Sequence, residues 1–483
     1  MNILFVASEV TPFAKTGGLA DVSGALPKAL EKLGENVKVV MPRYYGINRD
    51  NLQRLPMALG VDMGSLGEIW CGIYKGYLHK SNVEVYFIEH EEFYGRSGLY
   101  DENGIAYQDN DKRFVFLSKA SLKLSQALNF KPDIVHANDW HSAALPILLK
   151  TIYKNDKFFK DTKSILTIHN LQHQGVFDKS VLDILGVERI HFNPYTLEAL
   201  GAVNMLKGGI AFCDALTTVS QKYAKEIQTD EYGFGLQEHI RAYSYKLFGI
   251  LNGVDYDEWD PAVDRYIKKN YSVNSLEDKI ENKRDLQEIF NLVPSDNTVL
   301  IGFVGRFAKQ KGIELISSCI EGILQLGVQM VMLGSGERWA EDFFGEISRR
   351  YPQRFGCFAG YNNELAHKIE AGSDMFLMPS LFEPCGLNQI YSLRYGTLPI
   401  VRAVGGLDDT IINYDKFEDK GNGFKFYDAS AHALYHTLKW AVEVFKEEQE
   451  QFKKMQKRAM KEHFSWLDSA KKYQKVYNWT KGK

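Results

Sequence analysis

The chain has 483 residues, 45% of them apolar and 25% charged, and a formal net charge of −3. This length exceeds one ordinary hydrophobic core, so at least two domains are expected. The balance of 58 basic against 61 acidic residues gives no reason to expect nucleic acid or an anionic membrane as a partner.

The cysteines and the first residues indicate a cytoplasmic protein. Five cysteines are scattered along the chain without a CxxC pair, which suits a reducing compartment better than a disulfide framework. Residues 1–8 read as a strand and lack the cationic segment and cleavage site of a signal peptide. No apolar run approaches the roughly 18 residues that a membrane-spanning helix needs. We therefore expect a soluble protein of the cytoplasm.

The first predicted strand (2–8) leads through a glycine-rich loop into a predicted helix (19–33). Gly17 and Gly18 stand at the helix start, where they would let the backbone approach a ligand and leave N–H groups pointing at it. Lys15 adds a positive charge to the same loop. The loop suits a diphosphate, although a plain glycine-rich turn with a solvated lysine explains the pattern equally well.

Strands and helices then alternate along the first half of the chain. Strands are predicted at 37–42, 83–89, 133–138, 164–169, 215–219 and 247–254, with helices such as 112–128 and 143–153 among them. This alternation predicts a mostly parallel, doubly wound sheet. Residues 90–111 are polar, aromatic and glycine-rich and are predicted to form a long surface loop, a kind of segment that often binds ligands.

Polar side chains gather where two of these strands end. His136, Asp139 and His141 follow one strand and His169 follows the next, so we expect them at the same crevice as Lys15. A zinc site is one interpretation, but the chain lacks HExxH and these residues leave strands instead of sharing a helix face. Hydrogen bonding to sugar hydroxyls suits this mixture of side chains better, and no metal is predicted.

A second strand–helix series begins at residue 298. Its strands are predicted at 299–304, 329–333, 355–359, 375–378, 399–403 and 423–427. Residues 260–296 are charged and weakly periodic and are predicted to be a connector, whereas 439–462 and 466–479 read as helices. Asp255-x-Asp257 resembles the metal-binding DxD of some glycosyltransferases, but it runs directly into a turn and reads as loop.

We therefore predict an α/β chain with two Rossmann-like, doubly wound domains whose loops face one cleft. The predicted domains are 1–245 and 246–460, followed by a last helical segment at 461–483.

The loop after the strand at 299–304 is basic. Arg306 can hold phosphate oxygens with two parallel hydrogen bonds, and Lys311 supplies a point charge at the start of the next helix. Two cations at this position can stabilise a departing diphosphate without a divalent ion. A solvated basic loop is the alternative interpretation. Two further glycine-rich loops, 334–337 and 405–408, also follow strands.

One carboxylate stands out in the second half of the chain. Glu383 lies beyond the strand at 375–378 and just before a helix that begins near Leu387. In open α/β sheets the crevice at the carboxyl ends of the strands is where ligands bind. Simple capping of the next helix is the alternative role for Glu383.

Together these loops are typical of a sugar-nucleotide glycosyltransferase. The chain contains no GxxxxGK[ST] P-loop, no GxSxG elbow and no strand-linked GxGxxG. Transfer of glucose with retention needs a carboxylate near the donor sugar, cations on the diphosphate and hydrogen bonds to sugar hydroxyls. The candidates are Glu383, Arg306 with Lys311, and Asp139 with His169.

Four motifs, in this order and without large insertions, resemble those of bacterial glycogen synthases and plant starch synthases. They are KTGGL at 15–19, HANDWH at 136–141, GR with QKG within 305–312, and FEPCGL at 382–387. The resemblance implies a GT-B fold, ADP-glucose or UDP-glucose as donor and a growing α-1,4-glucan such as glycogen as acceptor. It also implies retention of configuration, no metal or cofactor, and a last helix that crosses back to the first domain.

The resemblance also assigns roles by position. In the first domain, Lys15 with Gly17 and Gly18 would bind substrate at the donor and acceptor end, and Asp21 would support the nucleotide. Asp139 and His169 would hold the glucosyl group, and Asn252 would help to position the donor. In the second domain, Arg306 and Lys311 would carry the diphosphate and Glu383 would stabilise the positively charged transition state or orient the sugar. The same motif places Cys385, Gly386 and Leu387 at the substrate.

One position departs from the wider class of retaining enzymes, which often carry a second glutamate shortly after the first. Eight residues after Glu383 the chain has Tyr391. We therefore favour front-face transfer, in which the leaving diphosphate accepts the proton of the acceptor. The alternatives are a sugar-nucleotide epimerase of the same fold and a non-catalytic glucan-binding protein. A pyridoxal-dependent phosphorylase is a weaker one, since no Schiff-base lysine setting is evident.

Overall fold

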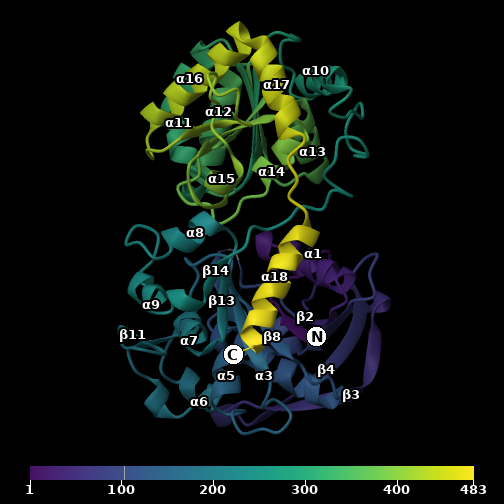
Figure 1. The fold of residues 1–483 in the computed structure, drawn as a ribbon, viewed down its shortest axis with the longest axis vertical. Coiled ribbons are helices and arrows are strands. Elements are labelled where there is room, and N and C mark those ends of the chain that lie inside the picture. Colours follow the sequence, from purple (N-terminus) through teal and green to yellow (C-terminus); the bar gives the residue numbers. More distant parts are fainter. Residues whose placement is uncertain (103, 483) are drawn as a thin grey trace. The chain divides into compact units, whose positions relative to one another are not determined.

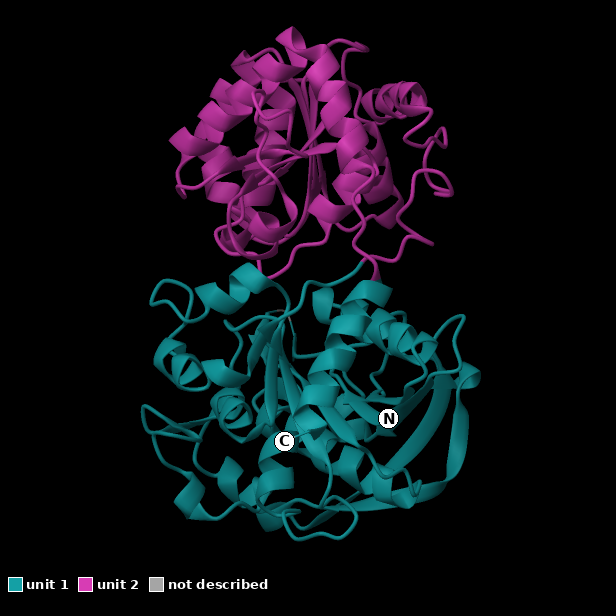
Figure 2. Cartoon of the chain, viewed as in Figure 1, with its two compact units in different colours: residues 1–253, 466–483 teal, residues 254–465 magenta. Residues whose placement is uncertain are grey.

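The computed structural model describes residues 1–102 and 104–482 (Figure 1). The chain divides into two compact units, shown in Figure 2: unit 1 comprises Met1–Gly253 with Trp466–Lys483, and unit 2 comprises Val254–Ser465. The chain thus leaves unit 1 after Gly253 and returns to it at Trp466. Within the described residues, no helix is both long and apolar enough to cross a membrane.

Unit 1 is built on a nine-stranded sheet with the order β14-β13-β9-β8-β1-β2-β5-β4-β3. Its parallel strands are β1 (Asn2–Val6), β2 (Asn36–Pro42), β5 (Glu84–Glu89), β8 (Ile134–Asn138), β9 (Lys163–Ile168), β13 (Ala215–Thr218) and β14 (Leu247–Gly249). The antiparallel pair β4 (Glu68–Tyr77) and β3 (Gln53–Asp62) extends one edge. The central parallel strands are largely buried and mainly apolar, as expected for a sheet covered on both faces.

The helices of unit 1 connect these strands. They include α1 (Gly18–Lys32), α3 (Asn110–Ala127), α4 (Asp139–Ser142), α5 (Ala144–Lys150), α7 (Met205–Phe212) and α8 (Gln221–Glu226). The last helix, α18 (Trp466–Lys481), packs against α1 within this unit. Tyr477 of α18 places its hydroxyl 2.8 Å from His136 Nδ1, and Gln474 donates to Glu35 Oε1 at 2.6 Å.

Unit 2 contains a six-stranded, fully parallel sheet with the order β17-β16-β15-β18-β19-β20. The strands are β15 (Leu300–Val304), β16 (Gln329–Gly334), β17 (Phe355–Ala359), β18 (Met375–Met378), β19 (Leu398–Arg402) and β20 (Phe424–Phe426). Its helices fall into two groups that pack together (Figure 1). The first group is α11 (Ile313–Gln325), α12 (Arg338–Arg350) and α16 (Ala431–Glu447). The second group is α10 (Lys279–Ile289), α13 (Asn363–Gly372), α14 (Asn388–Arg394) and α17 (Gln449–Ala459).

Both sheets reverse their strand order once. In unit 1 the reversal falls between β1 and β8, and in unit 2 it falls between β15 and β18. Ligands of doubly wound sheets bind outside the carboxyl ends of the strands at such a reversal. The predicted doubly wound α/β fold is confirmed, and its two reversals define where a site is to be sought.

Two local predictions were wrong, and one element was missed. The strand predicted at 247–254 ends at Gly249, and the helix predicted at 439–462 is two helices, α16 and α17, that break at Glu448. Residues 53–77 form the hairpin β3–β4, which was not predicted.

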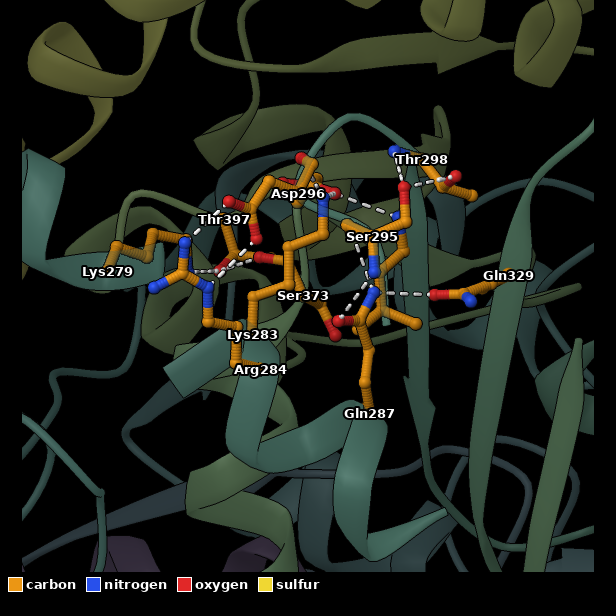
Figure 3. A network of polar contacts seen from close by, with 12 residues as sticks. Lys279, Lys283, Arg284, Gln287, Ser295, Asp296, Thr298, Gln329, Ser373 and Thr397 are labelled. Atoms are coloured by element: carbon orange, nitrogen blue, oxygen red, sulfur yellow. Dashed lines mark hydrogen bonds and ion pairs between the residues drawn. The ribbon is translucent and has the colours of Figure 1, made fainter. Parts of the chain in front are cut away.

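The segment predicted as a connector at 260–296 contains the helix α10, whose contacts are shown in Figure 3. Lys279 Nζ donates to Ala371 O at 2.6 Å, and Lys283 Nζ lies 2.7 Å from Asp374 Oδ2. Gln287 donates to Gln329 at 2.8 Å. The buried face of α10 is therefore mainly polar, and for this reason hydrophobic periodicity does not reveal it.

Candidate active site

Most of the predicted site residues lie beside the two reversals. In unit 1 they follow β1, β8 and the neighbouring β9, except for Asn252 beyond the edge strand β14, and in unit 2 they follow β15 and β18.

The loop between β1 and α1 is organised by Glu9, a residue that the sequence analysis did not single out. Its buried carboxylate accepts hydrogen bonds from Thr16 N at 2.5 Å, Thr16 Oγ1 at 2.6 Å and Gly17 N at 3.1 Å. The predicted surface loop at 90–111 instead contains the helix α2 (Glu91–Tyr94) and the start of α3. The Tyr100 hydroxyl, from the segment between these helices, donates to the same carboxylate at 2.6 Å. A carboxylate that directly follows a buried strand needs such hydrogen-bond donors. The position of Glu9 after the first strand is the one sequence signal that could have indicated its role.

Lys15 and Asp21 form an ion pair at the mouth of this loop, with 2.6 Å between Lys15 Nζ and Asp21 Oδ1. A Cβ atom added at Gly17 or Gly18 would meet no described atom within 4 Å. Gly17 gives α1 no side-chain cap in the described chain, and its own N–H donates to Glu9. The backbone at the two glycines is exposed, but the N–H of Gly17 is not free as the sequence predicted.

Asp139 and His169 come together at the ends of β8 and β9. Asp139 adopts a left-handed conformation with φ of 53°, and its Oδ1 accepts a hydrogen bond from His169 N at 2.7 Å. Burial, and to a smaller extent the Glu9 carboxylate, raises the pKa of Asp139 to about 7. This influence of Glu9 links Asp139 to the loop that carries Lys15.

His169 is a neutral hydrogen-bonding group. Burial lowers the pKa of His169 to about 3. Its Nε2 lies 3.0 Å from Asn138 Oδ1, and Asn138 Nδ2 donates to Val6 O at 3.0 Å. Because Asn138 Oδ1 can only accept, Nε2 of His169 carries the proton. His169 therefore suits recognition of a hydroxyl and not stabilisation of a negative charge.

The other two histidines of the predicted cluster belong to the core instead of the crevice, contrary to expectation. His136 uses both ring nitrogens, one with Tyr477 and the other 2.6 Å from Thr167 Oγ1. The His141 ring stacks on Tyr100 with 4.6 Å between centroids. Among the described residues, no group of three or more His, Cys, Asp or Glu side chains is placed to hold a metal ion. The zinc interpretation therefore has no support in this cluster.

Asn252 lies beyond β14, close to the end of unit 1. Its side chain is buried, and its Oδ1 makes no hydrogen bond to any described atom. Buried polar atoms without partners are rare in folded proteins. This property sets Asn252 apart from the polar residues that merely hold loops together.

In unit 2, Glu383 is held between two donors. Its Oε2 atom lies 2.6 Å from Lys311 Nζ and accepts a hydrogen bond from Ser380 Oγ at 2.9 Å. No side chain of the described residues caps α14 at Leu387, so Glu383 is not the cap of that helix. The structure brings Lys311 and Glu383 together, and it adds Ser380, which sequence reasoning missed.

Glycines fix the loop that carries Glu383. Gly405 has φ of 45°, and a Cβ there would lie 2.0 Å from Glu383 O. A Cβ at Gly406 would lie 2.0 Å from Cys385 O, and Gly406 N donates to Glu383 O at 3.1 Å. The third contact is at Gly312, where a Cβ would lie 2.1 Å from Pro379 O. Side chains at these positions would displace the loop, which explains the glycine-rich element at 405–408.

Arg306 and the remaining residues of the motif lie nearby. The exposed Arg306 guanidinium donates to Gln310 Oε1 at 3.2 Å, and Gln310 in turn donates to Phe382 O at 3.2 Å. Cys385 and Gly386 are fixed from the other side, since Gln389 Nε2 donates to both of their carbonyl oxygens at 3.0 Å. Leu387 is the residue before α14.

Comparison with known proteins agrees with this geometry. Residues 2–242 match the family model described as starch synthase catalytic domain, and residues 285–461 match that described as glycosyl transferases group 1. Two doubly wound units with loops at their reversals define a glycosyltransferase of the GT-B type.

Proteins with similar sequences and structures indicate which glycosyltransferases this chain is related to. Glycogen synthase 1 of Geobacter sulfurreducens is 50% identical over 99% of this chain and 96% of its own length, and glycogen synthase of Koribacter versatilis is 45% identical over 99% and 98%. The catalytic domain of starch synthase IV from Arabidopsis thaliana, bound to ADP and acarbose, superposes with a TM-score of 0.92 at 32% identity, covering 100% of this chain and 99% of that one. The chain belongs to the glycogen and starch synthase family.

A more distant structure shares the fold alone. Sucrose-phosphate synthase from Thermosynechococcus elongatus has a TM-score of 0.58 at 17% identity, over 99% of this chain and 98% of that one.

The family models and the glycogen synthase relatives confirm the predicted family and the predicted class of enzyme.

Proposed function

We propose that this protein transfers glucose from ADP-glucose to the non-reducing end of an α-1,4-glucan, with retention of configuration, in the synthesis of glycogen. The observation that carries the proposal is the Lys311–Glu383 pair beside the strand-order reversal of unit 2. Relatives that are named glycogen synthases, and a related starch synthase structure with ADP and acarbose, support the choice of substrates.

Unit 2 binds the nucleotide sugar in this proposal. Lys311 and Arg306 are the cations that take up the charge of the diphosphate as it departs. Lys311 also touches Glu383, so the cation beside the phosphate and the carboxylate beside the sugar are fixed by one contact of 2.6 Å. Glu383 then stabilises the positive charge that develops on the glucosyl group.

Tyr361 is proposed to carry the base of the nucleotide. It directly follows Gly360 at the carboxyl end of β17, and its side chain is 84% exposed. Gly360 N donates to Gly334 O at 2.9 Å, which places Tyr361 next to the glycine-rich loop at 334–337. An exposed aromatic ring there offers a stacking surface for adenine. This supports ADP-glucose over UDP-glucose, because the larger purine gains more from stacking.

Unit 1 binds the glucan end and the glucosyl group. Asp139 and the Nδ1 atom of His169 accept hydrogen bonds from sugar hydroxyls, and the buried Oδ1 of Asn252 accepts one more. Lys15, paired with Asp21 beside the side-chain-free backbone of Gly17 and Gly18, takes substrate at the mouth of the loop. These roles follow from the chemistry of each side chain and are part of the proposal.

The reaction proceeds by front-face transfer. Glu383 is held by Lys311 and Ser380, which suits an electrostatic role better than nucleophilic attack. Tyr391, where other retaining enzymes carry a second carboxylate, stacks on Trp259 with 3.9 Å between ring centroids. The leaving diphosphate oxygen therefore takes the proton of the acceptor hydroxyl as the new glycosidic bond forms. Detection of a covalent glucosyl–enzyme adduct would rule out this step.

A cytoplasmic location is part of the same proposal. All five cysteines are free thiols, and three of them (Cys71, Cys213 and Cys385) are buried. Free buried thiols are typical of proteins that work in a reducing compartment.

Nucleotide release tests the proposal. Purified protein is given ADP-glucose or UDP-glucose, each with and without glycogen. We expect ADP release that depends on glycogen and exceeds UDP release. Release without glycogen would favour the epimerase, and tight glycogen binding without release from either donor would favour a non-catalytic glucan-binding protein. Tyr361→Ala should weaken binding of ADP-glucose, whereas Tyr361→Phe should retain it.

A further inference from the structure

An exposed tryptophan lies on the edge hairpin of unit 1, away from the loops described above. Trp70, near the start of β4, is 59% exposed. Its partner on β3 is Gly60, and a Cβ at Gly60 would lie 3.1 Å from Trp70 Cζ2 and 2.5 Å from Glu68 Oε1. The indole and the Glu68 carboxylate therefore lie together against bare backbone, where a larger residue would lift them off the sheet.

The same face of the hairpin carries a charged cluster next to Trp70. Gly72 follows two residues later, and a Cβ there would lie 2.9 Å from Glu89 Oε2. Two residues along a strand span roughly 7 Å. Glu89 Oε1 in turn lies 3.0 Å from the Arg49 guanidinium. An aromatic ring is thus followed by fixed polar groups at a spacing that a short oligosaccharide covers.

The register places this face at the same edge of the sheet as the candidate site. Gly72 pairs with Glu89, the last residue of β5, so Trp70 extends beyond the carboxyl end of that parallel strand. In the sheet order, β4 is separated from β1 by β5 and β2. Three strand spacings correspond to roughly 14 Å. A glucan chain that ends near the β1 loop can therefore reach Trp70.

We propose that the hairpin platform, defined as Trp70 with Glu68, Glu89 and Arg49, binds a second stretch of the glucan acceptor. This inference rests on the proposed function for the identity of the polymer. A sugar ring presents C–H groups to the indole face and hydroxyls to the neighbouring carboxylates and guanidinium. The platform belongs to no part of the donor site.

The charges of the platform favour an uncharged polymer. Arg49 and Arg43 are matched by Glu89 and Glu91, with contacts of 3.0 to 3.3 Å. Glu68 adds a carboxylate without a paired cation among the ion pairs of the described residues, and it lies opposite Asp62 on β3. A polyanion would be repelled by the surplus of carboxylates, whereas a neutral polyol gains hydrogen bonds from them.

A second contact on one polymer raises the local concentration of chain ends at the site. Large acceptors that reach both places gain affinity, and acceptors too short to span the distance gain none. The platform therefore predicts a difference between glycogen and maltose that the catalytic loops alone do not produce.

The test compares Trp70→Ala with Tyr77→Ala. Tyr77 lies on the same strand and is 52% exposed, but it points to the opposite face because its position differs by an odd number of residues. Migration in native gels containing glycogen gives binding, and initial rates with glycogen and with maltose give the kinetic effect. We expect Trp70→Ala to bind glycogen roughly tenfold more weakly and to raise the KM for glycogen in proportion. Rates with maltose should be unchanged, and Tyr77→Ala should match the wild type.

The outcomes separate this inference from the proposed function. The platform would be overturned if glycogen in the gel retarded Trp70→Ala as much as the wild type. It would also be overturned if Trp70→Ala, at an unchanged melting temperature, lost equal activity with glycogen and with maltose. If the wild type transfers no glucose but binds glycogen through Trp70, the proposed function fails and the platform stands. If transfer occurs and glycogen binding does not depend on Trp70, the proposed function stands and the platform fails. Trp70→Tyr, which keeps an aromatic ring, should retain most of the binding.

Discussion

Glu9 and Glu383 solve the same problem in the two units. Each is a buried carboxylate that follows a strand, and each is stabilised by donors from a neighbouring loop. Glu383 has Lys311 as its partner, the residue proposed to carry the diphosphate. Glu9 has backbone N–H groups and hydroxyls as partners, and these contacts fix the shape of the Lys15 loop.

We predict that Glu9→Gln lowers kcat/KM by roughly ten- to a hundredfold, the range expected for loss of charge-assisted hydrogen bonds. A glutamine can keep its oxygen toward Thr16 N and Gly17 N, but its amide nitrogen then meets the hydroxyls of Thr16 and Tyr100, which must turn from donors into acceptors, and the negative charge is lost. Steady-state kinetics with ADP-glucose and glycogen provide the measurement. Tyr100→Phe removes only one of the four donors and should cost less. Activity of Glu9→Gln within threefold of wild type would contradict the positioning role.

A second prediction concerns acid stability. Burial lowers the pKa of His136 to about 3, below the value near 6.5 expected in the unfolded chain. Unfolding therefore takes up a proton between these values. The stabilisation is fully present above pH 6.5 and is lost as the pH falls toward 3.

His136→Asn should remove this dependence. Between pH 4 and 6, the free energy of unfolding of unit 1 should depend less steeply on pH in His136→Asn than in the wild type. We expect the two slopes to differ by up to about 1.4 kcal/mol per pH unit. Hydrogen exchange of peptides from unit 1 at several pH values would measure it. An unchanged slope would mean that His136 is protonated in the folded state.

The polar site residues were predictable to different degrees. Asp139, His169 and Glu383 follow apolar strands in the sequence, and the doubly wound pattern alone places strand ends at a common edge. Glu9 and Ser380 could not be assigned because their roles depend on which loop N–H or carboxylate folds over them. His136 was expected at the crevice, but the return of α18 covers it with Tyr477.

At the scale of elements, glycine contacts hold the Glu383 loop in place. Gly405→Ala would place a Cβ 2.0 Å from Glu383 O at a residue with φ of 45°. We predict a loss of stability of roughly 1–3 kcal/mol and a larger proportional loss of kcat, since the loop must shift away from Lys311. Thermal unfolding and steady-state kinetics together measure both effects.

Gly345 in α12 provides the matched control. A Cβ there meets no described atom within 4 Å, and a glycine in a helix costs stability relative to alanine. Gly345→Ala should leave kcat unchanged and raise stability by up to about 1 kcal/mol. If both substitutions behave alike, the contact between Gly405 and the Glu383 loop does not matter.

Elements were predicted well where apolar periodicity defines them. The parallel strands of both sheets are continuous apolar runs, and almost all of them were found within one or two residues. The helix α10 was missed because Lys279, Asn282, Lys283 and Gln287 make up most of its buried face. The break at Glu448 was missed because charged residues continue on both sides of it.

At the scale of the whole molecule, two doubly wound units carry different chemistry beside their reversals. Unit 2 provides cations and a carboxylate beside its reversal, and unit 1 provides hydrogen-bonding groups and the exposed backbone of Gly17 and Gly18. The return of the last helix to unit 1 followed from the family resemblance, since nothing in the periodicity of 466–481 shows which unit it joins.

Removal of metal ions tests whether side chains alone can balance the negative charge of the leaving diphosphate. Because Lys311 and Arg306 are fixed beside the proposed diphosphate site, we predict that transfer persists in excess EDTA and changes less than about twofold on addition of Mg²⁺. Protein passed over a chelating resin provides the starting material. Loss of activity that Mg²⁺ or Mn²⁺ restores would show that the two side chains do not suffice.

The most direct test is the extension of maltoheptaose by ADP-glucose, with the wild type, Glu383→Gln and the exposed control Glu364→Gln compared side by side. The wild type and the control should lengthen the chain by α-1,4-linked glucose, and Glu383→Gln should do so at least about a hundredfold more slowly while remaining folded. Extension by Glu383→Gln within tenfold of the wild type, or no extension by the wild type, would contradict the assigned reaction at its centre.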